Sequence, residues 1–151
     1  KVPLSDLARL MADLYEPAAE EAGLGFVSDI RAEPVVLGNQ QLLAQAIANL
    51  LDNALKYTPA EGRVTLTVRG PEGERGACIS VADTGPGIPA EQRESVLRRF
   101  VRLEASRSSP GNGLGLSLVD AVARLHGARL EMDDNGPGLI VSLVFPRMAP
   151  E

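Results

Sequence analysis

The stretch QAIANLLDNALKYTP, Gln45 to Pro59, joins an apolar helical face to an unusual polar one. Its apolar residues recur at helical spacing, which predicts a helix packed on a core within the longer pattern of residues 40–57. On the helical wheel, Asn49, Asn53 and Lys56 fall within about 60° of one another. Asparagine is a poor helix former, so a solvated face would rarely hold two of them one turn apart.

The chemistry of this polar face suits a metal-bound phosphate compound. An amide oxygen is a hard, neutral ligand for Mg²⁺, and a lysine ammonium suits phosphate. Because Mg²⁺ keeps most of its waters, one or two amides suffice where a triphosphate supplies the other ligands. The alternative is that both asparagines stand by accident on a wet face, and the helix alone leaves this open.

The rest of the chain mixes strand and helix patterns without regular alternation. Strands are predicted at residues 26–31, 35–37, 63–69, 77–82, 129–132 and 139–145. Further helices are predicted at 4–21, 90–100 and 114–126, with a mobile loop at 102–113. Ser5 is the predicted N-cap of the first helix, whose apolar stripe contains Leu7, Leu10, Met11 and Leu14. We therefore expect an α/β (α+β) two-layer sandwich, with a mixed, mostly antiparallel sheet of about five strands on about three helices.

Composition narrows the class of protein. The net charge is −5 and no basic block is present, which disfavours nucleic acid as a partner. No apolar run reaches the length of a membrane span. Cys78 and His126 are the only residues of their kinds, so thiolate and multi-histidine metal sites are excluded. The chain begins with Lys1 rather than Met, and we expect residues 1–151 to be one domain excised from a longer protein.

Two glycine-containing stretches add to the pattern. In VADTGPGIP, Val81 to Pro89, Asp83 has two possible roles. It is either one of the two catalytic carboxylates of an aspartic protease, or a residue after a strand that holds the adenine of ATP. The predicted helices and Pro86 disfavour the nearly all-β retroviral type of protease. In GNGLGLSLV, Gly111 to Val119, glycines lie directly ahead of an apolar helix. The free N–H groups at such a helix start predict a phosphate site, and a flexible loop is the alternative.

These motifs resemble those of sensor histidine kinases, within the superfamily that also holds gyrase, the heat-shock chaperone and MutL proteins. NLLDNALKYTP resembles the N box of that family. The resemblance implies that Asn53 is the principal Mg²⁺ ligand, that Asn49 assists, that Lys56 meets phosphate and that Tyr57 flanks the nucleotide.

The resemblance extends to the glycine stretches and the segment between them. DTGPGI resembles the first glycine box, which implies that Asp83 accepts a hydrogen bond from the adenine amino group. LRRFVRLEASRSS resembles the phenylalanine box and ATP lid. The resemblance implies that Arg102 or Arg107 reaches the γ-phosphate, and the alternative is that these lid arginines are solvated. The other nucleotide-binding residues implied by the resemblance are Gly85, Gly87, Ile88, Phe100, Gly113, Leu114, Gly115 and Leu116.

The resemblance implies a Bergerat fold that binds ATP and Mg²⁺ and transfers the γ-phosphate to a histidine. The hydrolysing branches carry a glutamate base where this chain has Asn49, which favours a kinase over a clamp-type ATPase. An ATP-binding docking module without catalysis is the other alternative. His126 lacks an acidic neighbour and is expected to be a structural helix-end residue.

The implied partners are an upstream dimerisation and phosphoacceptor domain and a response regulator receiver domain. We expect this fragment to be a cytoplasmic monomer without a membrane segment, and its parent to be a homodimer. Whether the parent is anchored in the inner membrane is left open by the sequence.

Overall fold

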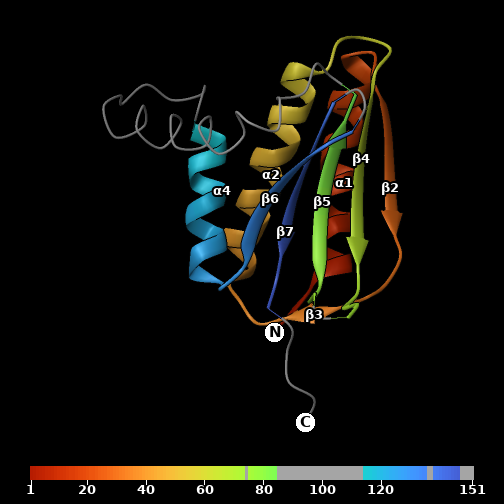
Figure 1. Ribbon diagram of the computed structural model, residues 1–151. Coiled ribbons are helices and arrows are strands. Elements are labelled where there is room, and N and C mark those ends of the chain that lie inside the picture. The colour runs from red at the N-terminus through yellow and green to blue at the C-terminus, as the bar shows by residue number, and fades with distance from the viewer. Residues whose placement is uncertain (74, 85–113, 136–137, 147–151) are drawn as a thin grey trace.

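The computed structural model describes residues 1–73, 75–84, 114–135 and 138–146 (Figure 1). The described helices are α1 (Leu4–Glu21), α2 (Gln40–Tyr57) and α4 (Leu114–Leu125). The described strands are β1 (Val2–Pro3), β2 (Gly25–Ile30), β3 (Val35–Val36), β4 (Arg63–Arg69), β5 (Cys78–Asp83), β6 (Arg129–Asp134) and β7 (Leu139–Val144). The bounds of α1, α2 and β4 are those predicted. The predicted helix 90–100 and loop 102–113 lie outside the described residues.

Five strands form one sheet in the order β2-β4-β5-β7-β6, in which β2 and β4 run parallel and every other pair is antiparallel. In β4, the buried residues Val64, Leu66 and Val68 alternate with more exposed ones, so one face of the sheet meets the core. Figure 1 shows the three helices on that face. The predicted two-layer sandwich with a mostly antiparallel sheet is confirmed.

The start of α1 differs from the prediction, because Ser5 is not its N-cap. The helix begins at Leu4 after Pro3, without a side-chain cap, and Ser5 is buried in the first turn. The Leu4 N–H donates to the Pro34 carbonyl at 3.0 Å, since β1 pairs with β3 immediately before the helix. A backbone acceptor therefore satisfies one of the free N–H groups of the first turn.

The apolar stripe of α1 is narrower than predicted. Leu7 and Met11 are buried, whereas Leu10 and Leu14 are 51% and 62% exposed. Tyr15 packs at the edge of the core, near the Asp52 carboxylate of α2. Burial, together with the Asp52 carboxylate, raises the pKa of Tyr15 to about 12, so the phenol keeps its proton at neutral pH.

His126 fastens the end of α4 to the start of α2. Its Nδ1 lies 2.7 Å from the Val122 carbonyl oxygen, and its Nε2 accepts from the Asn39 N–H at 3.0 Å. Asn39 is the N-cap of α2 and accepts from the Leu42 N–H. The His126 ring also lies edge-on to Phe145, with centroids 6.4 Å apart. These contacts bear out the structural role predicted for His126.

We expect His126→Ala to lower the free energy of unfolding by about 1–3 kcal/mol, because two hydrogen bonds and an aromatic contact are lost. Urea denaturation followed by circular dichroism measures the change. Arg124→Ala is the matched control, since Arg124 lies in the last turn of α4 and its exposed guanidinium pairs with Asp120 at 3.0 Å, a contact of small expected effect. Equal losses in the two variants would contradict the anchoring role of His126.

Within the described residues, no helix is both long enough and apolar enough to cross a bilayer.

Candidate nucleotide site

The polar face of α2 is built as the sequence predicts. Asn49 and Asn53 are half-buried, beside the buried Leu50 and Ala54, and Lys56 is exposed in the last turn. Within the described part of the chain, neither asparagine amide makes a hydrogen bond. The core side of α2 fixes the helix, so the two amides are held one turn apart at the edge of the packed layer.

The chemistry of these donors fits a Mg²⁺ that shares its ligands with a triphosphate. The described residues contain no group of three or more His, Cys, Asp or Glu side chains that could hold a metal. These described residues therefore do not form a metal site from protein ligands of those kinds alone. Mg²⁺ commonly takes one or two protein oxygens and completes its octahedron with water and phosphate. The amide oxygens of Asn49 and Asn53 meet that requirement.

Asp83 is half-buried at the end of β5, in the middle of the sheet. Its Oδ1 accepts from the Leu139 N–H at 3.3 Å, and its carbonyl oxygen accepts from Asn135 Nδ2 at 2.6 Å. The next residue, Thr84, exchanges hydrogen bonds with the Arg63 backbone at 2.9 and 3.1 Å. Asp83 is thus held on the β4 side through the next residue, Thr84, and on the other side by Asn135 and by Leu139 of β7.

The end of α2 and Asp83 lie at the same end of the molecule. Residues 58–62 alone separate α2 from β4, and Val64 of β4 pairs with Asp83. α4 packs against α2 in the opposite direction, because His126 at its end contacts Asn39 before the start of α2. The start of α4 therefore lies at this same end (Figure 1).

The start of α4 offers backbone donors to an anion. Leu114, Gly115 and Leu116 form its first turn, where N–H groups have no acceptor within the helix. The helix dipole adds partial positive charge at this end. A phosphate suits such a terminus. The structure thus brings the predicted phosphate donors to the end of the molecule that holds Asn53 and Asp83.

Part of the predicted site lies beyond what the structure describes. Tyr57 is described only as the last residue of α2, without its side chain. The predicted site residues outside the described residues are Gly85, Gly87, Ile88, Phe100, Arg102, Arg107 and Gly113.

Asn135 and Gly138 contact or adjoin Asp83, and the sequence gives no indication of it. The stretch DDNGPG carries only turn signals, of which Asn-Gly is typical of a hairpin. That signal predicts a hairpin between β6 and β7, and the structure has these strands paired. It carries no information on contact with a residue about 50 positions earlier, which depends on the strand order of the sheet.

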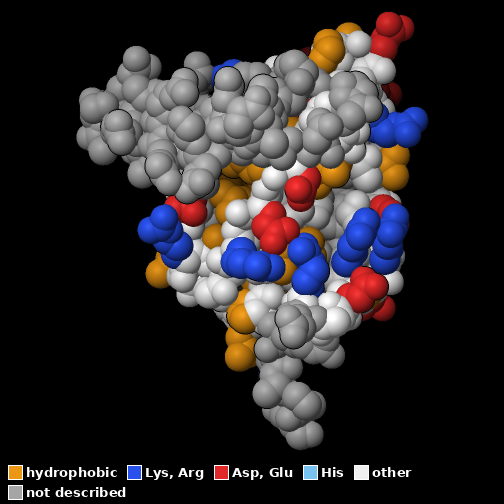
Figure 2. Space-filling model, in the orientation of Figure 1, with side chains coloured by type: hydrophobic (Ala, Val, Ile, Leu, Met, Phe, Trp, Pro, Cys, Tyr) orange, Lys and Arg blue, Asp and Glu red, His pale blue; other side chains and the backbone are white. Residues whose placement is uncertain are grey.

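The uncovered face of the sheet carries charges of both signs (Figure 2). Arg75 and Arg129 contact the Glu131 carboxylate at 3.2 and 3.1 Å, and Arg31 pairs with Asp29 at 2.9 Å. Exposed pairs of this kind contribute little to stability. These arginines neutralise neighbouring acids and do not form a patch of one sign.

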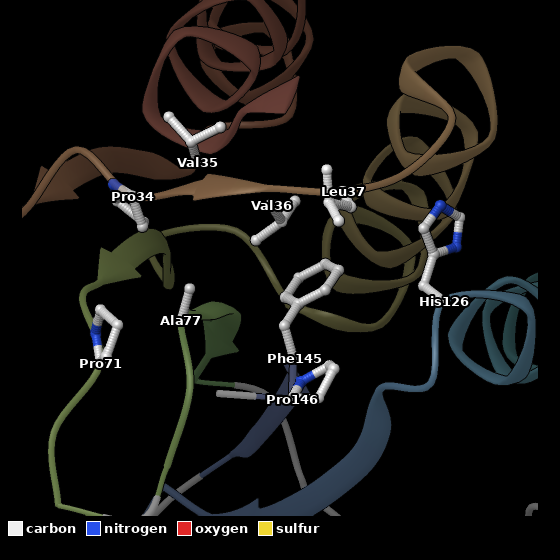
Figure 3. Close-up of a pocket in the computed structure, with 9 residues that line it drawn as sticks. All are labelled: Pro34, Val35, Val36, Leu37, Pro71, Ala77, His126, Phe145 and Pro146. Atoms are coloured by element: carbon white, nitrogen blue, oxygen red, sulfur yellow. The ribbon is translucent and has the colours of Figure 1, made fainter. Parts of the chain in front are cut away.

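An apolar pocket of about 410 Å³ lies at the opposite end of β5. Leu37, Ala77 and Phe145 line it together with His126 (Figure 3). Ala77 precedes β5 and Asp83 ends it, so about 20 Å of strand separates this pocket from the candidate site. The pocket is therefore not part of the nucleotide site.

Comparison with known proteins gives the class of this chain. Residues 38–149 match the family described as histidine kinase-, DNA gyrase B-, and HSP90-like ATPase. The match covers most of the chain, and the chain belongs to this family. The resemblance to the ATP-binding domains of histidine kinases is confirmed.

Its relatives within the family are histidine kinases. The chain is 43% identical over 116 residues to the signal transduction histidine-protein kinase/phosphatase MprB of Mycolicibacterium smegmatis, covering 74% of this chain and 23% of that protein. Its structure is similar to a mycobacterial sensor histidine kinase MprB, with a TM-score of 0.78, 31% identity and 98% and 99% of the two chains covered.

Full-length ShkA, solved in complex with AMPPNP, is similar with a TM-score of 0.79 and 31% identity, over 99% of this chain and 31% of that one. The chain therefore spans well under half the length of ShkA and of the curated relative.

Proposed function

We propose that this chain binds Mg²⁺-ATP and transfers the γ-phosphate to a histidine on a separate dimerisation domain, as the catalytic domain of a two-component sensor kinase. The observation that carries the proposal is the convergence of Asn53, Asp83 and the start of α4 at one end of the molecule. The similarity to ShkA, which was solved with AMPPNP, supports the nucleotide class.

Each part of the site has a separate role in this proposal. Asp83 accepts from the adenine amino group, and the N–H groups of the first turn of α4 bind phosphate oxygens. Asn53 and Asn49 hold Mg²⁺ through their amide oxygens, while Lys56 binds phosphate. The bound Mg²⁺ supplies neutralisation of the charge on the transferring phosphoryl group.

Asn49 directs the site toward transfer rather than hydrolysis. An amide cannot take a proton from water near neutral pH, so the site lacks a general base at this position. Transfer to histidine depends more on positioning and charge neutralisation, because an imidazole is already nucleophilic. This contrast sets the kinase proposal above a clamp-type ATPase.

The proposal includes parts that lie beyond the described residues. Gly85, Gly87 and Ile88 would border the base, Phe100 would anchor the lid, and Arg102 or Arg107 would reach the γ-phosphate. The partners would be the parent's dimerisation and phosphoacceptor domain and a response regulator receiver domain.

We expect the chain to bind ATP more tightly than GTP, because the Asp83 carboxylate accepts from the adenine amino group and guanine presents a carbonyl oxygen instead. Asp83→Ala should lose about tenfold to a hundredfold in ATP affinity, as expected for a hydrogen bond to a charged group. Titration calorimetry with Mg²⁺ present measures both. Equal affinities of the native chain for ATP and GTP would rule out the proposed role of Asp83.

A further inference from the structure

Two hydrogen bonds bring the segment that joins β6 to β7 onto Asp83, and a third lies within the segment. Asn135 follows β6 directly, is half-buried, and donates from Nδ2 to the Asp83 carbonyl oxygen at 2.6 Å. Its own N–H donates to the Gly138 carbonyl at 3.1 Å, which closes the segment on itself. Leu139, the first residue of β7, donates its N–H to Asp83 Oδ1 at 3.3 Å. One residue of β5 is thus held through both its backbone and its side chain.

Gly138 makes this approach possible. It is buried, its φ is +113°, and a Cβ at this position would overlap the Asp83 carbonyl oxygen. An L-residue would be strained in that conformation and would push the segment away from β5. The close contact between this segment and Asp83 therefore depends on glycine.

The Asn135 amide replaces a strand partner. The β5–β7 ladder ends at the pair Ala82 and Ile140, one residue before Asp83. The Asp83 carbonyl would need another donor at this half-buried position, and the Asn135 side chain supplies it. With the carbonyl fixed by Asn135 and Oδ1 fixed by Leu139, the carboxylate has a set orientation. A carboxylate has about four lone-pair sites, so the bond from Leu139 does not exhaust its acceptor capacity.

We propose that Asn135 is a positioning residue for base recognition, which acts by fixing the orientation of the Asp83 carboxylate. This inference rests on the proposed function, in which Asp83 accepts from the adenine amino group. It goes further by assigning part of the base selectivity to Asn135, which lies between β6 and β7 and not on β5. A residue that only capped the sheet would affect stability and leave base selectivity unchanged.

The test compares ATP with purine riboside triphosphate, which lacks the 6-amino group. Both dissociation constants are measured by calorimetry with Mg²⁺ present. The dissociation constant of the analogue divided by that of ATP reports the contribution of the 6-amino group. Asn135→Asp keeps the shape of the side chain and removes the donor, and Asn135→Ser is a second variant should the first fold poorly. Asp133→Ala, at an exposed position of β6, is the control for disturbance of the strand.

We expect the Asn135 variants to reduce the ratio about threefold to tenfold, through weaker ATP binding at unchanged affinity for the analogue. Asp133→Ala should keep the native ratio. Asn135 variants that lose stability, or lose affinity equally for both nucleotides, while retaining the native ratio would overturn the inference. Asp83→Ala separates the two failures. If it also retains the native ratio, the role of Asp83 in the proposed function is wrong. If it abolishes the preference for ATP, only the role of Asn135 is wrong.

Discussion

Asn53→Ala is expected to abolish phosphotransfer and to remove most of the Mg²⁺ dependence of triphosphate binding. The Asn53 amide oxygen is the proposed principal ligand of Mg²⁺. Because Mg²⁺ takes only one or two protein ligands, the site has little to compensate for the loss of this one. The fold should survive, since Asn53 is only half-buried and alanine has the higher helix propensity by about 0.5 kcal/mol. Transfer of labelled phosphate to the phosphoacceptor domain and calorimetry with and without Mg²⁺ measure the two effects.

The matched control for that variant is Gln45→Ala, which changes an exposed side chain two turns earlier on α2. It should transfer phosphate as the native chain does. Thermal unfolding of both variants checks that the helix is intact. Transfer at the native rate by Asn53→Ala would eliminate Asn53 as the metal ligand.

Asn49→Glu is expected to convert the site toward hydrolysis. The native chain should turn over ATP slowly, because an amide cannot activate water. A carboxylate on the same face of α2, beside the proposed Mg²⁺ and γ-phosphate, should raise phosphate release by up to about 10²–10⁴-fold, the usual contribution of a general base. Phosphate release by the isolated chain under saturating ATP measures this gain.

Asn49→Gln is the control for the gain in hydrolysis, because glutamine has the length of glutamate without its basicity. It should stay as slow as the native chain. Rapid turnover by the native chain would favour the clamp-type ATPase. Equal rates in the Glu and Gln variants would show that position 49 does not face the attacking water.

Long, strongly periodic segments of this protein could be predicted from the sequence. α2 has the predicted bounds because its apolar residues repeat over 18 residues and Thr58-Pro59 ends the helix. β4 also has the predicted bounds, because Val64, Leu66 and Val68 alternate with polar residues. The polar face of α2 follows from the same periodicity, so the helical spacing alone assigns Asn49 and Asn53 to one face.

What the sequence could not supply depends on contacts between distant segments. β1 is two residues long and pairs with β3 more than 30 positions later, so no local pattern marks it or predicts that Leu4 needs no serine cap. The exposure of Leu10 and Leu14 depends on which part of α1 the sheet covers. The contact of Asn135 with Asp83 exists only because β5 lies next to β7 in the sheet.

The most direct measurement of the central claim mixes this chain, ATP labelled at the γ-phosphate and the proposed helical phosphoacceptor domain of its parent. The account predicts acid-labile label on a histidine of the helical domain, dependent on Mg²⁺, and none on His126, which is held in place by Asn39 and Val122. Absence of label on the helical domain while ATP is bound, or label on His126 itself, would contradict it.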